Sequence, residues 1–284
     1  MLPYFEQPRI DLGPIPIHAF GVLVFLAVAI GTDLAARRAA AVGLQPSVTS
    51  SLALWILVPG FVGAHVFDSL WYHPGEVART PSVLFDLFAG MSSFGGFLGA
   101  IVGAFAWRLA GVALLPHADV IVSVFPISWA IGRAGCTLAH DHPGIRTTVE
   151  NPLAFAYPDG PRWDLGLLEM LFAVALSCVF VALWRRKLPC GSYLAIACLT
   201  YAPVRFGLDF LRADIDAGGD ARYVGWTPAQ WACPVLLALG LFAMRHALDE
   251  RGRARRANAG LSSDHSRASE RHDAEREPPS ETHG

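Results

Sequence analysis

The chain has 284 residues, of which 53% are hydrophobic and only 16% are charged, and its mean hydropathy is +0.40. Soluble domains carry about 25% charged residues, so the composition argues against a water-soluble globule, and a formal net charge of −2 argues against a basic nucleic-acid binder. Five cysteines without a Cys-x-x-Cys spacing suggest neither a zinc knuckle nor a disulfide framework. What remains is an integral membrane protein.

Apolar segments long enough to cross a membrane recur along the chain. A helix needs about 20 mostly apolar residues to cross the hydrocarbon core. Seven segments qualify, at about 16–35, 48–67, 92–111, 118–134, 165–184, 190–210 and 228–246, and the fourth is the shortest of them. The sequence therefore predicts an all-α fold, a polytopic membrane protein with seven transmembrane helices that form one domain over residues 1–248.

Arginines between the spans predict the orientation of the chain. Alternate loops and the tail collect a set of basic residues that is expected to stay in the cytoplasm: Arg37, Arg38, Arg108, Arg185, Arg186, Lys187, Arg251, Arg253, Arg255 and Arg256. The N-terminus is then outside and the C-terminus inside. Residues 249–284 are polar and almost free of bulky apolar side chains, which predicts a disordered cytoplasmic tail.

Ionisable side chains within the predicted spans are the first candidates for a functional site, because each costs about 2.5–3.5 kcal/mol to insert. They are Asp33, His65, Asp68, Arg133, Glu169, Arg205, Asp209 and Arg212. Spans two, four and six run outward in the predicted topology, and the third span begins outside at Ser92. Most of these residues are therefore expected at one depth, near the outer leaflet.

Arg205, Asp209 and Arg212 are spaced to share one face of a helix. Two guanidinium groups with a carboxylate between them suit a phosphate, because each guanidinium forms bidentate hydrogen bonds and stays charged. The competing interpretation for Arg212 is a side chain that reaches the lipid headgroups. For Arg133 the competitor is an arginine that caps the end of its helix.

The loop after the fourth span opens with His140, Asp141 and His142. Two histidines around a carboxylate can bind a metal or supply a general base, although a polar turn without chemistry is the alternative. A serine protease built on Ser92 or Ser93 is disfavoured, because Ser-Ser-Phe-Gly is no nucleophile elbow and no histidine on a late helix is a convincing partner.

Several short motifs together resemble the prolipoprotein diacylglyceryl transferase family. Gly132-Arg133-Ala134-Gly135, followed by Cys136, Asp141 and Gly144, is similar to its signature. Further similar pieces occur in the same order, and together they cover about residues 12–246: Leu12–Ile17 with Phe20-Gly21, Gly63-Ala64-His65, Gly90-Met91-Ser92 with Gly95-Gly96, Arg205-Phe206 with Asp209 and Arg212, and Gln230.

The resemblance implies a membrane enzyme of the bacterial inner membrane. Such an enzyme moves the diacylglyceryl group of phosphatidylglycerol to the lipobox cysteine thiol of a preprolipoprotein and releases glycerol phosphate. It implies no metal and no cofactor. Arg133 and Arg205 would bind the phosphate, with Gly144 and Ser92 also in the substrate site, and Asp141 and Asp209 would replace family glutamates in the catalytic set.

The departures from the family pattern concern proton transfer. The family histidine usually assigned to proton abstraction falls on Phe94, and the signature asparagine is Cys136. His65 or His140 would then supply the base, and His65→Ala is expected to lower turnover more than His142→Ala, because His65 lies at a helix end. The alternative is a non-catalytic lipid-binding or transport protein on the same scaffold.

Overall fold

The fold is a bundle of long helices, seen in a computed structural model that describes residues 1–12, 15–85, 90–217, 219–220 and 222–274. The long helices are α1 (Ala19–Ala41), α2 (Pro46–Phe67), α4 (Ser93–Leu109), α5 (Leu114–Ala139), α6 (Leu165–Leu183), α7 (Ser192–Leu208) and α8 (Pro228–Ala274). Shorter helical segments are η1 (Asp68–Tyr72), α3 (Pro74–Arg79), η2 (Pro81–Phe85), η3 (Asp209–Leu211) and η4 (Ile215–Ala217).

Six helices of the described chain are long and apolar enough to cross a membrane, which confirms a multi-pass helical membrane protein. The predicted count of seven is not confirmed, because α4 is apolar but only 17 residues long. The segment expected to be shortest belongs instead to α5, which has 26 residues. Pro126 lies inside α5 without ending it, and the helix continues on both sides of the apolar segment predicted at about 118–134.

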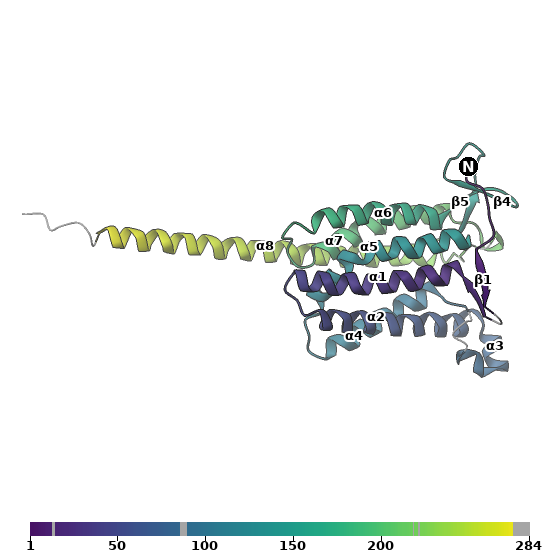
Figure 1. Ribbon diagram of the computed structural model, residues 1–284, viewed down its shortest axis with the longest axis horizontal. Helices are drawn as coiled ribbons and strands as arrows, with labels where there is room; N and C mark the ends of the chain where they lie inside the picture. Colours follow the sequence, from purple (N-terminus) through teal and green to yellow (C-terminus); the bar gives the residue numbers. More distant parts are fainter. Residues whose placement is uncertain (13–14, 86–89, 218, 221, 275–284) are drawn as a thin grey trace, which may run out of the picture.

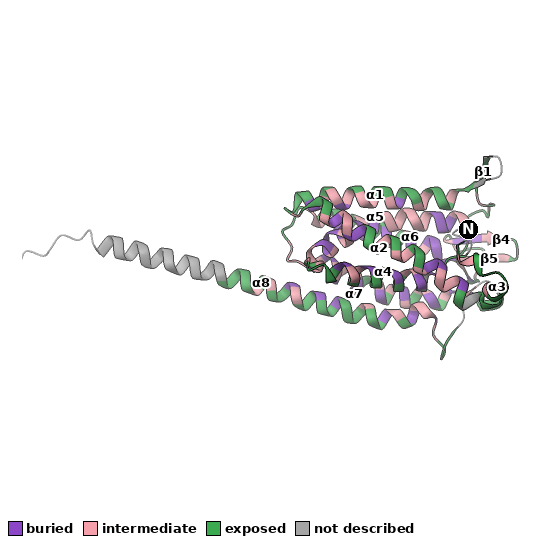
Figure 2. Ribbon diagram, turned by 90° about the horizontal axis from the view of Figure 1, so that it is seen from below, coloured by how far each residue is buried: buried purple, intermediate pink, exposed green. Residues whose placement is uncertain are grey.

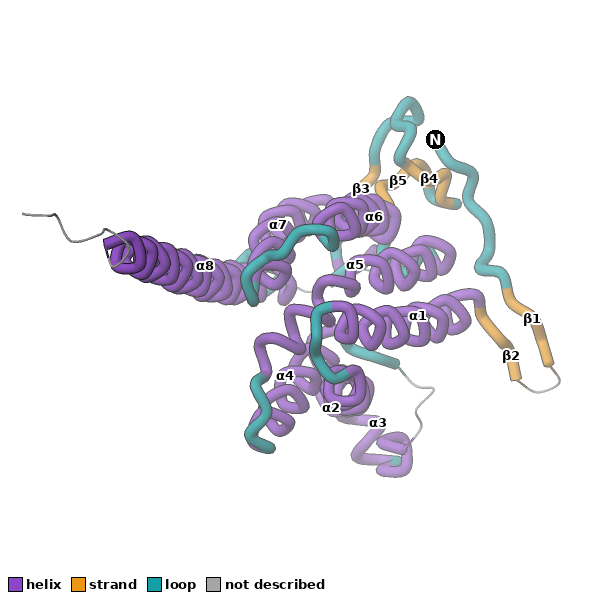
Figure 3. Tube along the Cα trace, turned by 60° about the vertical axis from the view of Figure 1, so that its left-hand side comes forward, coloured by secondary structure: helices purple, strands orange, loops and turns teal. Residues whose placement is uncertain are grey.

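Helix α1 lies between two groups of helices, which also contact each other directly through α2 and α5. It packs against α2, which pairs with α4, and against α5, which packs with α6 (Figures 1 and 3). The last residues of α2, α5 and α7 lie at the end of the bundle that also carries the N-terminus, while α8 projects from the opposite end (Figure 1). We call the end of the bundle that carries the N-terminus of the chain the N-terminal end. Exposed residues lie mainly on the outer faces of the helices, and buried residues lie mainly where helices face one another (Figure 2).

Glycines allow α4 to lie directly on α2. A Cβ atom at Gly99 would lie 2.0 Å from the carbonyl oxygen of Pro59, and one at Gly103 would lie 1.7 Å from that of Trp55. No side chain fits at either position, so these two glycines serve close helix packing, as is usual in membranes.

Replacing Gly103 with leucine is therefore expected to lower the free energy of unfolding by about 1–3 kcal/mol or more, the range for overpacked cores. The measurement is thermal unfolding of the purified protein in detergent. Gly21→Leu is the matched control, because nothing lies within 4 Å of a Cβ atom at Gly21. Equal melting temperatures for the two variants would contradict the packing argument.

Two small antiparallel sheets at the N-terminal end were not predicted. Strands β1 (Arg9–Leu12) and β2 (Ile15–His18) pair with each other. Between α5 and α6, β3 (Pro143–Arg146), β4 (Ala154–Tyr157) and β5 (Gly160–Asp164) form a sheet with the order β3-β5-β4. Such pairing satisfies the backbone groups of segments that leave the helices.

Helix α8 continues well beyond its apolar part. The expected domain boundary at residue 248 lies within this helix, which extends to Ala274. Arg251, Arg253, Arg255 and Arg256 follow the apolar stretch and are exposed. The disorder and the cytoplasmic location of residues 249–284 stay predictions, and residues 275–284 lie outside the described part.

Candidate functional site

Two arginines from different helices meet on one carboxylate near the N-terminal end of the bundle. Arg133 of α5 places Nη2 2.7 Å from Oε2 of Glu169 on α6. Arg205 of α7 places Nη1 2.9 Å from Oε1 of the same carboxylate. The structure therefore brings together the two guanidinium groups that the sequence analysis assigned to one site.

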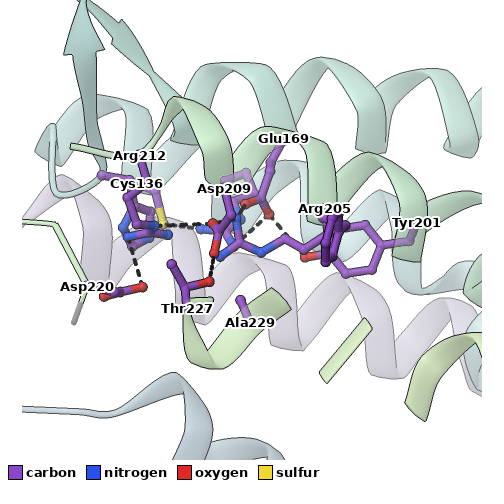
Figure 4. Close-up of polar contacts among 12 residues, drawn as sticks. Cys136, Glu169, Tyr201, Arg205, Asp209, Arg212, Asp220, Thr227 and Ala229 are labelled. Atoms are coloured by element: carbon purple, nitrogen blue, oxygen red, sulfur yellow. Dashed lines mark hydrogen bonds and ion pairs between the residues drawn. The ribbon is translucent and has the colours of Figure 1, made fainter. Parts of the chain in front are cut away.

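The ion pairs continue from Arg205 toward the loop before α8. Nη1 of Arg205 lies 2.7 Å from Oδ1 of Asp209, and Nε of Arg212 lies 3.2 Å from the same oxygen. Arg212 also reaches Asp220, with 3.2 Å between Nη1 and Oδ2 (Figure 4). We call Arg133, Glu169, Arg205, Asp209, Arg212 and Asp220 the arginine–carboxylate network.

Residues at the start of α8 form hydrogen bonds with the end of α7 and with Asp209 beside this network. The hydroxyl of Thr227 donates a hydrogen bond to Asp209 (Figure 4). Gln230 donates from Nε2 to the carbonyl oxygen of Phe206 and accepts from the backbone N–H of Thr227. Asp209 is thus held by a side chain of another segment, and its position depends on the contact between the two helices.

Burial differs across the network in a way that matters for ligand access. The side chains of Glu169 and Asp209 are 1% and 0% exposed, whereas that of Arg133 is 18% exposed. Buried carboxylates hold the guanidinium groups in place, since an unpaired charge is costly in such surroundings. Arg133 is the member of its ion pair that remains more open to a ligand.

Glu169 and Tyr201 are site residues that the sequence reasoning did not assign. Glu169 was noted only as a charged residue within a span, although a buried carboxylate in a membrane needs a partner. The hydroxyl of Tyr201 donates a hydrogen bond of 3.3 Å to Oε2 of Glu169. The ring of Tyr201 in turn packs edge-on against Trp129, with 4.5 Å between ring centroids.

Asp141 and His142 lie on the same side as the arginines. Their Oδ1 and Nε2 atoms are 3.7 Å apart. Burial and the positive charges of Arg133, Arg212 and Arg205 lower the pKa of His142 to about 3, whereas burial raises the pKa of Asp141. The imidazole of His142 is therefore neutral at neutral pH and offers a lone pair.

His140 turns away from this group. It ends α5 with a positive φ of 52°, and its Nδ1 lies 3.2 Å from Oδ2 of Asp164. The ring of Tyr4 stacks on it at 4.7 Å, and Phe155 packs edge-on at the same distance. His140 joins the N-terminal segment to the small sheet, and no described contact connects it to the arginine–carboxylate network.

His65 and Ser92 belong to the other group of helices. His65 is buried on α2, where Nε2 lies 3.2 Å from the carbonyl oxygen of Val83. Ser92 caps the N-terminus of α4 by accepting a hydrogen bond from the backbone N–H of Gly95. Within the described chain no hydrogen bond or ion pair links either residue to the arginines, and the side chain of Phe94 is outside the described part.

Gly144 packs where a side chain has no room. A Cβ atom there would lie 2.7 Å from the carbonyl oxygen of Leu211 and from Cβ of Trp163. Its backbone pairs with that of Arg212 in an isolated bridge. The glycine thus allows β3 to approach η3 closely, next to the network that the sequence analysis expected it to serve.

Fold and site together define a multi-pass helical membrane protein with a largely buried network of arginines and carboxylates. The chain belongs to the prolipoprotein diacylglyceryl transferase family, whose pattern it matches over residues 8–246. This match covers every residue of the arginine–carboxylate network.

Curated relatives cover most of the chain. The phosphatidylglycerol–prolipoprotein diacylglyceryl transferase of Azoarcus sp. is 28% identical over 264 residues, which are 88% of this chain and 98% of the relative. Proteins of the same name are 30% identical in Chromohalobacter salexigens, over 74% of this chain and 80% of the relative, and 29% identical in Nitratidesulfovibrio vulgaris, over 87% and 97%.

Proposed function

We propose that this protein transfers the diacylglyceryl group of phosphatidylglycerol to the lipobox cysteine thiol of a preprolipoprotein and releases glycerol phosphate. Family membership and the names of the relatives support the reaction. The observation that carries the proposal is the meeting of Arg133 and Arg205 on one buried carboxylate, because this geometry suits a bridging phosphate.

The proposed reaction is displacement at a glyceryl carbon. The substrate thiolate attacks the carbon, the carbon–oxygen bond to the phosphate breaks, and its electron pair leaves with glycerol phosphate. Two demands follow: the thiol must lose its proton, and the leaving phosphate must be stabilised as negative charge develops on it.

Arg133 and Arg205 meet the second demand. A guanidinium has five N–H donors, and within the described chain Arg205 binds Glu169 and Asp209 through Nη1. Phosphate oxygens that approach Arg133 can share its charge with Glu169. Asp209 and Glu169 then act as positioning residues, since they hold the guanidinium groups in a fixed orientation before substrate binds.

In the bilayer, we propose that α4 also spans the membrane and completes a set of seven spans. Its 17 residues fall within the range of about 17–25 residues for membrane-spanning helices. The N-terminal end would then face the outside of the bacterial inner membrane, where exported preprolipoproteins emerge, and the arginine-rich part of α8 would face the cytoplasm.

The reaction is tested with purified protein, phosphatidylglycerol and a synthetic lipobox peptide. We expect glycerol phosphate to be released in step with formation of the thioether-linked lipopeptide, detected by mass spectrometry. Phosphatidylglycerol that binds without either product would support a non-catalytic lipid-binding protein instead and would refute the transferase proposal.

The location of His142 leads us to expect a larger loss of activity from His142→Ala than from His65→Ala, the opposite of the expectation from sequence. His142 lies beside the arginines, whereas His65 is bonded to the backbone at Val83. We therefore expect His142→Ala to lower the initial rate of lipopeptide formation at least tenfold and His65→Ala to lower it less at equal amounts of folded protein. A stronger effect of His65→Ala would restore the expectation from sequence.

A further inference from the structure

Basic residues from two distant segments meet far from the arginine–carboxylate network. Helices α1 and α6 both finish at the end of the bundle from which α8 projects (Figure 1). Arg38 lies in the last turn of α1, and Arg185, Arg186 and Lys187 follow shortly after α6. Nη1 of Arg38 donates a hydrogen bond of 3.3 Å to the carbonyl oxygen of Trp184, 146 residues further along the chain. This contact joins the two segments, and we call Arg38, Arg185, Arg186 and Lys187 the basic patch.

Two aromatic side chains hold Arg38 in a fixed orientation. Its Cζ atom lies 5.6 Å from the ring centroid of Trp184 and 6.0 Å from that of Tyr193, and Nη2 donates a hydrogen bond of 3.4 Å to the hydroxyl of Tyr193. Nε1 of Trp184 donates to the carbonyl oxygen of Ser123 at 3.2 Å. Tyr193 packs edge-on against Phe180, with 5.1 Å between ring centroids. The guanidinium is therefore placed before a ligand arrives, which lowers the cost of binding.

The charge of the basic patch is unmatched within the protein. In the described part of the chain, no ion pair involves any residue of the patch. Asp119 and Glu250 lie near the start of α7, but backbone N–H groups occupy them: Leu194 donates to Oδ1 of Asp119 at 2.8 Å, and Cys190 donates to Oε2 of Glu250 at 2.6 Å. The patch is thus free to attract an anion from outside the protein.

The surface beside the basic patch is apolar. Val179 and Val181, near the end of α6, are 49% and 45% exposed, and α6 is one of the helices long and apolar enough to cross a membrane. Arg185 and Arg186 are exposed where this apolar helix ends. A ligand that contacts both parts has apolar chains and an anionic head, as a phospholipid does. Tryptophan and tyrosine are enriched at this depth of a bilayer, and guanidinium groups bind phosphate through paired hydrogen bonds.

We propose that the basic patch binds the headgroup phosphate of an anionic phospholipid in the leaflet at that end of the bundle. A guanidinium has five N–H donors, so Arg38 can donate to the phosphate while it keeps its bonds to Trp184 and Tyr193. The exposed side chains of Arg185, Arg186 and Lys187 then surround the headgroup. This site is separate from the one proposed for the transferred lipid, which lies near the N-terminal end.

Native mass spectrometry of the full-length protein in detergent tests the site by counting bound lipids. Arg133→Ala serves as the starting protein, so that lipid held by the arginine–carboxylate network contributes less. We expect it to bind phosphatidylglycerol in preference to phosphatidylcholine, and less tightly as the salt concentration rises. Free glycerol phosphate is the competitor. Displacement of the lipid by an equal concentration of it would show a site for a free anion and would overturn the lipid assignment.

A variant of Arg38 connects the binding to the patch. Arg38→Gln, made in the same starting protein, is expected to weaken phosphatidylglycerol binding about tenfold, because hydrogen bonds to charged groups are the stronger ones. The matched control is Arg79→Gln combined with Arg146→Gln, because both residues are exposed and lie near the N-terminal end. Equal affinities for the patch variant and the control would overturn the proposal.

A second variant leaves the contact between α1 and α6 intact, in case Arg38→Gln does not fold. It replaces the three exposed basic residues of the patch together, by Arg185→Gln, Arg186→Gln and Lys187→Gln. Phosphatidylglycerol with a photoreactive group near its headgroup is expected to crosslink to residues 179–193 of the starting protein and several-fold less to this variant. Crosslinks confined to the N-terminal end would exclude a lipid site at the patch.

The transfer assay keeps this site apart from the proposed transferase function. Arg38→Gln in the otherwise unchanged protein is expected to leave the rate at saturating phosphatidylglycerol as it was, because Arg38 lies at the opposite end from the network. Lipid binding that depends on Arg38, in a protein that forms no lipopeptide, would support the lipid site and refute the transferase. Full transfer by a protein whose lipid binding ignores Arg38→Gln would do the reverse.

Discussion

Replacement of Arg133 by alanine is expected to reduce lipopeptide formation by at least about 10²–10³-fold, the usual effect of removing one preorganised group that stabilises developing charge. Arg133 is the more open partner of Glu169, with 18% of its side chain exposed. Without its guanidinium, the phosphate loses bidentate hydrogen bonds, and among the described residues Glu169 keeps one ion-pair partner, Arg205. The measurement is the initial rate of thioether formation in membranes that contain equal amounts of inserted protein.

Two further variants show whether the guanidinium geometry or only its charge is needed. Arg133→Lys keeps one positive charge but loses the planar fork, so its rate is expected to fall between those of alanine and arginine. Arg37→Ala is the control, because Arg37 forms an exposed pair with Asp33 far along α1. A rate for Arg133→Ala equal to that of Arg37→Ala would remove Arg133 from the mechanism.

The helices and the position of the site near one end of the bundle could be predicted because both depend on local patterns. Apolar runs predict spans, and the alternation of spans places charged residues at one end. That argument correctly brought Arg133 and Arg205 together. The spacing of Arg205, Asp209 and Arg212 likewise predicted one polar face, and the structure joins these three by ion pairs.

The features that the sequence could not predict are contacts between segments far apart in it. Neighbours in the chain suggested that His140 and His142 act together, yet the positive φ at His140 turns its ring toward Tyr4 and Asp164. His65 shares the predicted depth of the arginines, but depth does not say which side of α1 a helix occupies. Glu169 acquires its role only because α5, α6 and α7 meet, which no local pattern reveals.

Replacement of Glu169 by alanine is expected to lower the free energy of unfolding by about 3–5 kcal/mol, because removing one partner of a buried ion pair leaves the other charge uncompensated. Here two guanidinium groups lose a shared carboxylate, at 2.7 Å and 2.9 Å. Asp33→Ala is the matched control: its pair with Arg37 is exposed, and such pairs contribute about 0–1 kcal/mol. Thermal unfolding in detergent measures both.

An anion that binds between the two arginines should repair much of this loss. If the site holds the phosphate of a lipid, phosphatidylglycerol is expected to raise the melting temperature of Glu169→Ala more than that of the unchanged protein, because its phosphate takes the place of the missing carboxylate. Phosphatidylcholine, whose headgroup has no net charge, is expected to raise it less. The difference arises only if Arg133 and Arg205 are close enough to share one anion and that anion can reach them from the bilayer. Equal stabilisation of both proteins by the two lipids would mean that the paired arginines only hold the helices together and that the leaving phosphate is bound elsewhere.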